Sequence, residues 1–199
     1  MILRTLCALL LISMICSCGS EVPPKNFCDF VECLNGATCD GEACQCPLGY
    51  EGIDCAFQKD PKKIEIKAVT ISDFSATNIN GEEWDHDPEE LFPAFPDNGF
   101  PDIYIIVSNS TGIIYNKTNP NVLNVEPGMD VSLQLANNIL ITDINSPHKI
   151  SIMDFDKGGS SQLIELVTFD PYVSDNGFPA EIEIENNGVS LNLTCNYSF

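Results

Sequence analysis

The sequence has few basic residues, and this scarcity excludes whole classes of partner. Nine Lys and Arg stand against 29 Asp and Glu in 199 residues, which gives a formal net charge of −20 at pH 7. Lys and Arg neutralise nucleic-acid phosphates, so we expect no nucleic-acid partner. The same charge opposes simple adsorption to anionic lipid. A chain this acidic suits cation binding, and it equally suits plain solubility.

Catalytic signatures are also scarce. The chain has two histidines, His86 and His148, and no Gly-x-Ser-x-Gly segment that would present a nucleophile. The run Gly158-Gly159-Ser160-Ser161 lacks the strand–turn–helix context of such a segment. We therefore predict that the chain is not an enzyme. A carboxylate-dependent hydrolase stays open as an alternative, because the separation of two carboxyl groups cannot be read from a sequence.

Long apolar runs are confined to the N-terminus. The run Leu6–Ile15 follows Arg4 and is too short to span a bilayer, which predicts a signal peptide over residues 1–17. The segment I-C-S-C-G-S that ends this region resembles the lipobox of bacterial lipoproteins. This resemblance implies lipidation of Cys18, a lipid anchor as the only membrane attachment, and a place in the bacterial cell envelope. An ordinary secretory peptide, and hence a secreted chain, is the alternative.

Six of the ten cysteines crowd into 28 residues. From Cys28 to Cys55 the spacing is C-x4-C-x5-C-x4-C-x-C-x8-C. So short a segment cannot bury enough core to fold unaided, and in an exported chain such a cluster predicts a disulfide framework. A zinc site is the competing use of these thiols, but the cluster holds no histidine. The spacing alone does not fix which cysteines pair.

The cluster resembles an EGF-like module on two motifs. The chain reads C-L-N-G-A-T-C from Cys33 and C-Q-C-P-L-G-Y-E-G-I-D-C from Cys44. The resemblance implies a module over residues 28–55, preceded by a tether over residues 18–27. It implies no calcium site there, because Pro24–Phe27 replaces the acidic stretch of the calcium-binding members. It also implies three bridges, which join Cys28 with Cys39, Cys33 with Cys44, and Cys46 with Cys55.

After a polar linker over residues 56–63, apolar and polar residues alternate. Val189, Leu191 and Leu193 alternate with polar residues, which is typical of a strand with one buried face. Cys195 continues this row, which predicts a buried free thiol. No long stretch shows helical periodicity. Nine strands are expected, near residues 64–74, 102–109, 113–117, 131–135, 138–143, 149–155, 163–169, 180–185 and 189–195.

These strands predict the fold class. Asn187-Gly188 separates the last two strands, and Asn-Gly is a favoured hairpin turn. About nine short strands over residues 64–199 are typical of an antiparallel β-sandwich. The chain is therefore expected to be all-β, with a small disulfide-rich, EGF-like module followed by the sandwich.

Two acidic stretches accompany the predicted strands. One runs from Glu82 to Asp102 with eight carboxylates and no Lys or Arg, and the other holds Asp154 and Asp156 before Gln162. With the segment F-P-D-I-Y-I-I-V from Phe100, they resemble the motifs of a C2-type calcium-binding β-sandwich. The resemblance implies a C2-like fold and calcium as the cofactor. An acid is expected where Gln162 stands, so one charged ligand is missing.

The residues themselves support a cation site. Side chains at i and i+2 of a strand point the same way, so Asp154 and Asp156 can aim at one point while Phe155 turns to the core. Calcium takes about six to eight oxygen ligands. Ordinary turn chemistry also explains Asp-x-Asp before Gly-Gly, and this alternative stays open. The expected ligands are Asp85, Asp97, Asp102, Asp154, Asp156 and Gln162.

These features together predict a surface-anchored binding module, calcium-dependent, that acts in recognition or adhesion. The expected partner is a protein or glycan at the cell surface. The alternative is a purely structural envelope lipoprotein whose acids only solvate it and which has no metal site.

Overall fold

The computed structural model describes residues 26–84, 99–117, 122–156 and 161–199, which form two compact units. The described part of the first unit holds residues 26–47 and 52–56. The second unit holds residues 48–51 together with the described residues from 57 onward. Within the described ranges, no helix is long and apolar enough to cross a membrane.

The first unit is a small disulfide-linked structure. A single turn of 3-10 helix, η1 (Phe27–Asp29), begins at Asn26, whose side chain accepts a hydrogen bond from the Cys28 amide at 2.9 Å. A short hairpin joins β1 (Thr38–Cys39) to β2 (Cys44–Gln45). Three disulfides hold the unit together, and they join the pairs that the EGF-like resemblance implied: Cys28–Cys39, Cys33–Cys44 and Cys46–Cys55.

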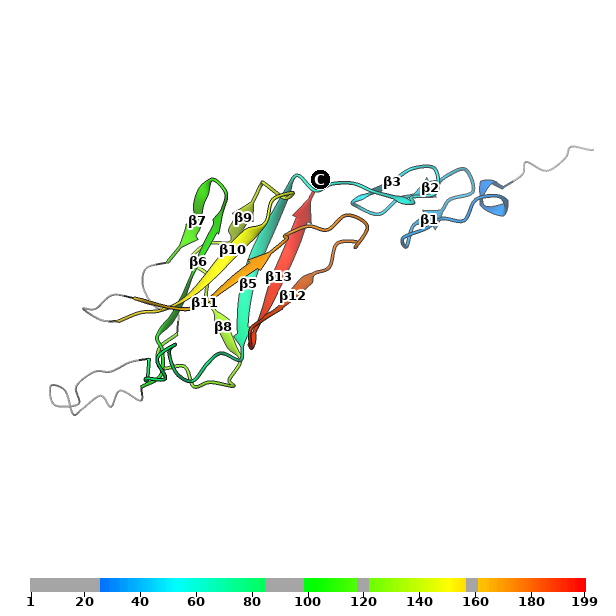
Figure 1. The fold of residues 1–199 in the computed structure, drawn as a ribbon. Helices are drawn as coiled ribbons and strands as arrows, with labels where there is room; N and C mark the ends of the chain where they lie inside the picture. Colours follow the sequence, from blue (N-terminus) through cyan, green and yellow to red (C-terminus); the bar gives the residue numbers. More distant parts are fainter. Residues whose placement is uncertain (1–25, 85–98, 118–121, 157–160) are drawn as a thin grey trace, which may run out of the picture. The chain divides into compact units, whose positions relative to one another are not determined.

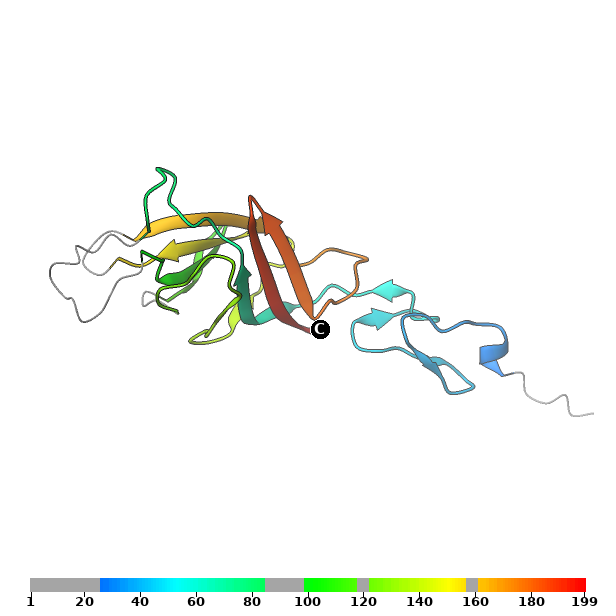
Figure 2. The same ribbon diagram turned by 90° about the horizontal axis from the view of Figure 1, so that it is seen from below.

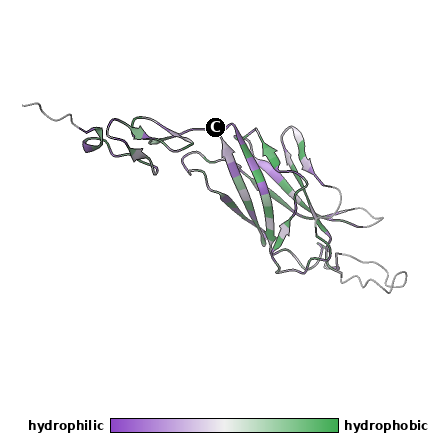
Figure 3. Ribbon diagram, turned by 180° about the vertical axis from the view of Figure 1, so that it is seen from behind, coloured by the Kyte–Doolittle hydropathy of each residue, from purple (hydrophilic) through white to green (hydrophobic). Residues whose placement is uncertain are grey.

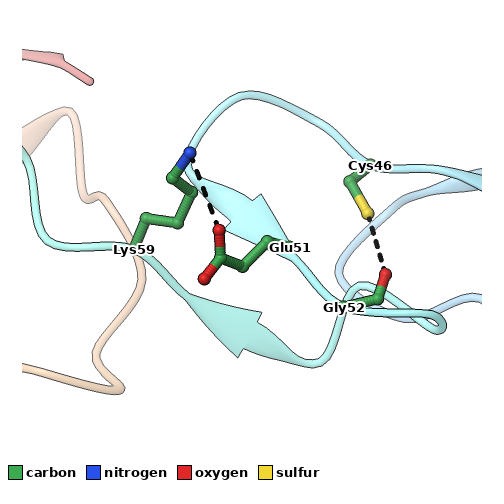
Figure 4. Close-up of polar contacts among 4 residues, drawn as sticks. All are labelled: Cys46, Glu51, Gly52 and Lys59. Atoms are coloured by element: carbon green, nitrogen blue, oxygen red, sulfur yellow. Dashed lines mark hydrogen bonds and ion pairs between the residues drawn. The ribbon is translucent and has the colours of Figure 1, made fainter.

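The second unit begins with a short hairpin of β3 (Tyr50–Glu51) and β4 (Phe57–Gln58). Figure 4 shows the ion pair across it, with Lys59 Nζ at 3.7 Å from Glu51 Oε2. Both side chains are well exposed, so the pair contributes little to stability. Within the first unit, the same figure shows Cys46 Sγ at 3.6 Å from the Gly52 carbonyl oxygen. Cys46 is in a disulfide and has no S–H to donate, so this is a close contact only.

The rest of the second unit is an antiparallel β-sandwich, which confirms the predicted fold class. One sheet has the order β11-β10-β6-β7, and the other has the order β12-β13-β5-β8 with β9 also paired to β5. Figures 1 and 2 show the two sheets facing each other. The strands are β5 (Lys63–Ser72), β6 (Ile103–Asn109), β7 (Gly112–Asn116), β8 (Val131–Leu133), β9 (Ile139–Ile141), β10 (His148–Asp154), β11 (Gln162–Phe169), β12 (Glu181–Asn186) and β13 (Val189–Ser198).

Alternation along the strands builds the core. In β13 the buried row is Val189, Leu191, Leu193 and Cys195, and the residues between them are partly exposed. Figure 3 shows the corresponding hydrophobic and hydrophilic bands across the strands. Inward rows from both sheets form one apolar cluster, which includes Ile66 of β5 and Ile152 of β10. The nine predicted strands are all present, with ends displaced by no more than three residues.

Two details of β13 match their sequence patterns. Asn187 and Gly188 both have positive φ, 47° and 86°, as a two-residue hairpin of type I′ requires. Cys195 is a free, buried thiol, and burial raises its pKa to about 12. A thiol with so high a pKa is a packing group and not a nucleophile.

Candidate functional site

Strand direction brings several of the predicted ligands to one end of the sandwich. Strand β10 ends at Asp154, which pairs with Ile103 at the start of β6 and with Gln162 at the start of β11. The start of β6 lies beside the end of β10 (Figure 1), and Asp102 immediately precedes β6. We call this end, with Asp102, Asp154 and Asp156, the carboxylate end. Asp85 and Asp97 lie outside the described residues.

Asp154 is the most constrained of these acids. It continues the inward row of β10 after His148, Ile150 and Ile152, and its side chain is completely buried. One carboxylate oxygen, Oδ1, accepts a hydrogen bond from the Asp102 amide at 2.8 Å. Among the described residues, the other oxygen, Oδ2, has no hydrogen-bond partner. Asp154 therefore fastens β6 to β10 through one oxygen and leaves the second buried and unsatisfied.

The surroundings of Asp154 disfavour the ionised form of its carboxyl group. Burial is the main reason that its pKa rises to about 6, and the nearby carboxylates of Asp156 and Asp102 raise it further. The hydrogen bond from the Asp102 amide acts in the opposite direction. At pH 7 the carboxyl is still mostly ionised, so the folded sandwich carries a buried negative charge, and within the described ranges no basic side chain forms an ion pair with it. Such an arrangement costs stability unless a cation binds beside it.

Asp156 and Gln162 belong to a second, more open group. They line a pocket of about 490 Å³ together with residues of the segment that follows β5. Burial raises the pKa of Asp156, and a hydrogen bond with the Gln162 side chain opposes this rise. The Gln162 amide also donates to the Trp84 carbonyl oxygen at 3.5 Å. Among the other lining residues, Asn78, Asn80, Glu82 and Glu83 have side-chain oxygens, and Trp84 has none.

The segment that forms this wall is held in place by its own hydrogen bonds. The Asn78 side chain accepts from the amides of Asn80 and Glu82, at 2.9 and 3.1 Å. Trp84 is buried, and its indole N–H donates to the Ser75 carbonyl oxygen at 2.8 Å. Its backbone amide donates to the Gly99 carbonyl oxygen at 3.3 Å. The pocket wall is therefore formed before any ligand arrives.

The geometry corrects one sequence expectation. Phe155 does not turn to the core; it is half-buried and packs edge-on against Tyr104, with ring centroids 6.4 Å apart. Asp154 takes the inward position instead, because the row that begins at His148 places even-numbered residues inside. The strand ends there, so Asp156 no longer follows the strand alternation. Among the described residues, no three Asp, Glu, His or Cys side chains gather tightly enough to hold a metal ion.

Sequence reasoning missed several residues of the pocket. Asn78, Asn80 and Glu83 were not predicted as site residues, although they lie just before Asp85 in the sequence N-I-N-G-E-E-W. The available signal was the series of turn-forming residues from Asn78 to Gly81, which predicts an ordered turn and places the following acids. The carboxylate end is thus built from three segments, which are the segment after β5, the start of β6 and the junction of β10 with β11.

Comparison with known proteins adds little. No family model matches the sequence, and no curated protein matches it either. A solved structure of human GIVD cytosolic phospholipase A2, in complex with methyl gamma-linolenyl fluorophosphonate, shares 13% sequence identity with this chain. The similarity covers 68% of this chain but only 17% of the phospholipase chain, with a TM-score of 0.36.

This match contradicts the prediction that the chain is not an enzyme, because the matched protein is an enzyme. We therefore withdraw that prediction. A TM-score of 0.36 carries no argument about which reaction, substrate or residues would be involved. The three disulfides, in contrast, are typical of an exported protein in an oxidising compartment.

Proposed function

We propose that this chain is a surface-anchored binding protein whose sandwich binds calcium at the carboxylate end and recognises a protein or glycan. In this proposal the first unit is an EGF-like spacer and the sandwich is a C2-like module. Lipid on Cys18 holds the chain in the bacterial cell envelope. The proposal rests on the lipobox, the disulfide framework and the acidic loops of the sequence, together with the buried carboxylate of Asp154.

Asp154 is the observation that carries the calcium proposal. Its carboxylate is completely buried and lies near two other carboxylates, and in the described part of the chain one of its oxygens has no partner and no basic side chain pairs with it. The neighbouring pocket, which Asp156 lines, offers carboxylate and amide oxygens from Asn78, Asn80, Glu82, Glu83 and Gln162, and oxygen is the ligand atom that calcium prefers. In this proposal Asp154 and Asp156 hold the ion, Asp102 and Gln162 support it, and Asp85 and Asp97 complete the site. Calcium would supply the missing positive charge.

Thermal unfolding with and without calcium tests the site. Calcium should raise the melting temperature of the sandwich, because a ligand that binds only the folded state stabilises it. Asp154→Asn together with Asp156→Asn should abolish this rise and the heat of calcium binding in calorimetry. Asp143→Asn is the matched control, because Asp143 lies between β9 and β10, at the opposite end of the sandwich, and should change neither readout. Equal responses of the wild type and the double variant would contradict the calcium site and favour an alternative without a metal.

Partner binding needs a separate measurement. The exported chain, immobilised through its C-terminus, should capture its protein or glycan from an array in calcium and release it in a chelator. Equal binding in calcium and in the chelator would show that partner recognition does not require the metal site.

The lipid anchor is tested independently. Mass spectrometry of the N-terminal peptide should find a diacylglycerol-modified Cys18, and Cys18→Ser should move the chain from the membrane fraction to the soluble fraction. A mature chain that begins at another residue and carries no lipid would support the secretory alternative.

A further inference from the structure

The residues that precede β8 pass directly beside Asp102. The pairing of β6 with β7 begins at Ile106, and beside the start of β6 the neighbouring position is taken by residues 122–125. Ile103 and Val122 form an antiparallel bridge there: the Ile103 amide donates to the Val122 carbonyl oxygen at 2.8 Å, and the Val122 amide donates back to the Ile103 carbonyl oxygen at 3.3 Å. We call residues 122–125 the bridging segment.

A side chain of the carboxylate end holds the bridging segment. Asp102 Oδ1 accepts a hydrogen bond from the Asn124 amide at 2.8 Å, and the next amide, that of Val125, donates to the Pro101 carbonyl oxygen at 2.9 Å. Asn124 has a positive φ of 50°, so the segment bends at the residue that Asp102 holds. Val125 is 4% exposed and belongs to the apolar cluster, whereas Leu123 is 61% exposed. The segment is therefore fixed by a carboxylate, by backbone hydrogen bonds and by a buried valine.

Asp102 is also bonded to the end of β10, which carries the candidate calcium ligands. The Asp102 amide donates to Asp154 Oδ1 at 2.8 Å, and the Asp102 carbonyl oxygen accepts from the Phe155 amide at 2.9 Å. One residue thus connects the bridging segment to β10 through its side chain, its amide and its carbonyl. A carboxylate that a backbone amide already orients loses less conformational freedom when an ion binds beside it.

We propose that the bridging segment is a positioning element of the calcium site, and that calcium binding and the seating of this segment on β6 stabilise each other through Asp102. This inference rests on the calcium site proposed above. An ion held by Asp154 and Asp156 favours the orientation of Asp102 that the Asn124 amide also holds. Such a coupling is reciprocal, so loosening the segment weakens calcium binding, and calcium reduces the opening of the segment.

Two valines of nearly equal burial test this coupling. Val125→Ala loosens the bridging segment without touching a calcium ligand. Val131→Ala is the matched control, because Val131 is 5% exposed in the same apolar cluster but belongs to β8, which pairs with β5. Both variants should lose similar stability, since each loses the same buried methyl groups. In calorimetry of the full disulfide-bonded chain, Val125→Ala should bind calcium about threefold to tenfold more weakly than Val131→Ala.

Substitutions within the segment assign the effect to the Asn124 amide. Asn124→Gly keeps the amide and tolerates the positive φ, so it should preserve calcium affinity. Asn124→Pro removes the amide donor and cannot adopt this φ, so it should weaken calcium binding at least as much as Val125→Ala. Leu123→Ala removes only an exposed side chain and should change nothing. A loss of affinity with Leu123→Ala equal to that of Asn124→Pro contradicts the assignment.

Hydrogen exchange measures the reciprocal effect in the wild-type chain. Calcium should slow exchange of the Asn124 and Val125 amides about fivefold or more. The Gly177 amide is the reference, because it donates to Gln58 Oε1 in the segment between β11 and β12 and should be slowed less. Equal slowing at Gly177 would show only a general stabilisation of the sandwich. Faster exchange at Asn124 would show that the ion competes with this amide for Asp102. Either result overturns the proposed coupling.

The same measurements separate a failure of this coupling from a failure of the calcium site. If the wild-type chain gives no heat of calcium binding, the calcium site is wrong and the coupling falls with it. If the wild type binds calcium but Val125→Ala and Val131→Ala bind it equally well, the calcium site stands and the coupling alone is wrong.

Discussion

In the first unit, Cys55 alone is completely buried among the described residues, whereas inward rows from both sheets of the sandwich form one continuous apolar cluster. The first unit is therefore held by covalent bridges that constrain its unfolded chain. The sandwich is held by the removal of apolar surface from water. The two units therefore differ in what a substitution can remove: a covalent bridge in the first unit, and buried apolar surface in the sandwich.

Removing a bridge should have the largest effect, and only on the first unit. Cys33→Ser with Cys44→Ser should cost about 2–5 kcal/mol and leave that unit largely unfolded, because little packing remains to replace the bridge. Hydrogen exchange of the amides near β1 and β2 measures the loss. The fluorescence of Trp84, the one tryptophan of the chain, reports on the sandwich and should keep its unfolding midpoint. A large shift of that midpoint would show that the two units share their stability.

Shortening a side chain in the core should destabilise the sandwich and leave the first unit folded. Ile152→Ala should cost the sandwich about 2–5 kcal/mol, since Ile152 is completely buried in the apolar cluster. Denaturant unfolding followed by Trp84 fluorescence measures this. Leu163→Ala on the neighbouring strand is the control, because Leu163 is 52% exposed and its loss should cost well under about 1 kcal/mol. Similar costs at the two positions would contradict the position of the core.

Asp154 should make the sandwich less stable as the pH rises. Its pKa is about 6 in the folded state, against an ordinary value of 3.8 for an aspartate, so the folded state holds the proton more tightly. The stability linked to this group is fully present below about pH 4 and is lost as the pH rises through about 6. The total is about 3 kcal/mol. Asp154→Asn should remove this loss and, in a chelator, should be more stable than the wild type at pH 7.

Unfolding free energies between pH 4.5 and 7.5, with the chelator present, measure this difference. Other carboxylates titrate in both proteins, so the informative quantity is the wild-type value minus the variant value at each pH. If this difference in unfolding free energy does not change with pH, the fold does not raise the pKa of the Asp154 carboxyl.

The smallest effect concerns Cys195. Because it is buried and its pKa is about 12, a thiol reagent should modify it only after the sandwich unfolds. Mass spectrometry after brief exposure of the native and the denatured protein checks this. Cys195→Ala should cost about 1 kcal/mol or slightly more, for the lost packing. Modification in native buffer would indicate that the last strand opens.

The sequence predicted the sandwich well because alternation and turn chemistry are local. The row from Val189 to Cys195 and the turn at Asn187-Gly188 needed no information from the rest of the chain. The candidate site was predicted only in part. Which of Asp154 and Phe155 points inward depends on where the buried row of β10 starts, at His148, and both neighbouring strands set that register. Gln58 bonds to Tyr172, and both Tyr172 and Tyr197 contact Phe178, yet no local pattern connects residues so far apart in sequence.

The chain passes between the two units more than once. Residues 48–51 belong to the second unit, and residues 52–56 return to the first. The Cys46–Cys55 bridge encloses this excursion, so both ends of any cut between them stay covalently joined. A protease that nicks the backbone between Cys46 and Cys55 would therefore not separate the sandwich from the first unit. Separating the two units would require a cut after Cys55, or a cut between the two cysteines followed by reduction of their bridge.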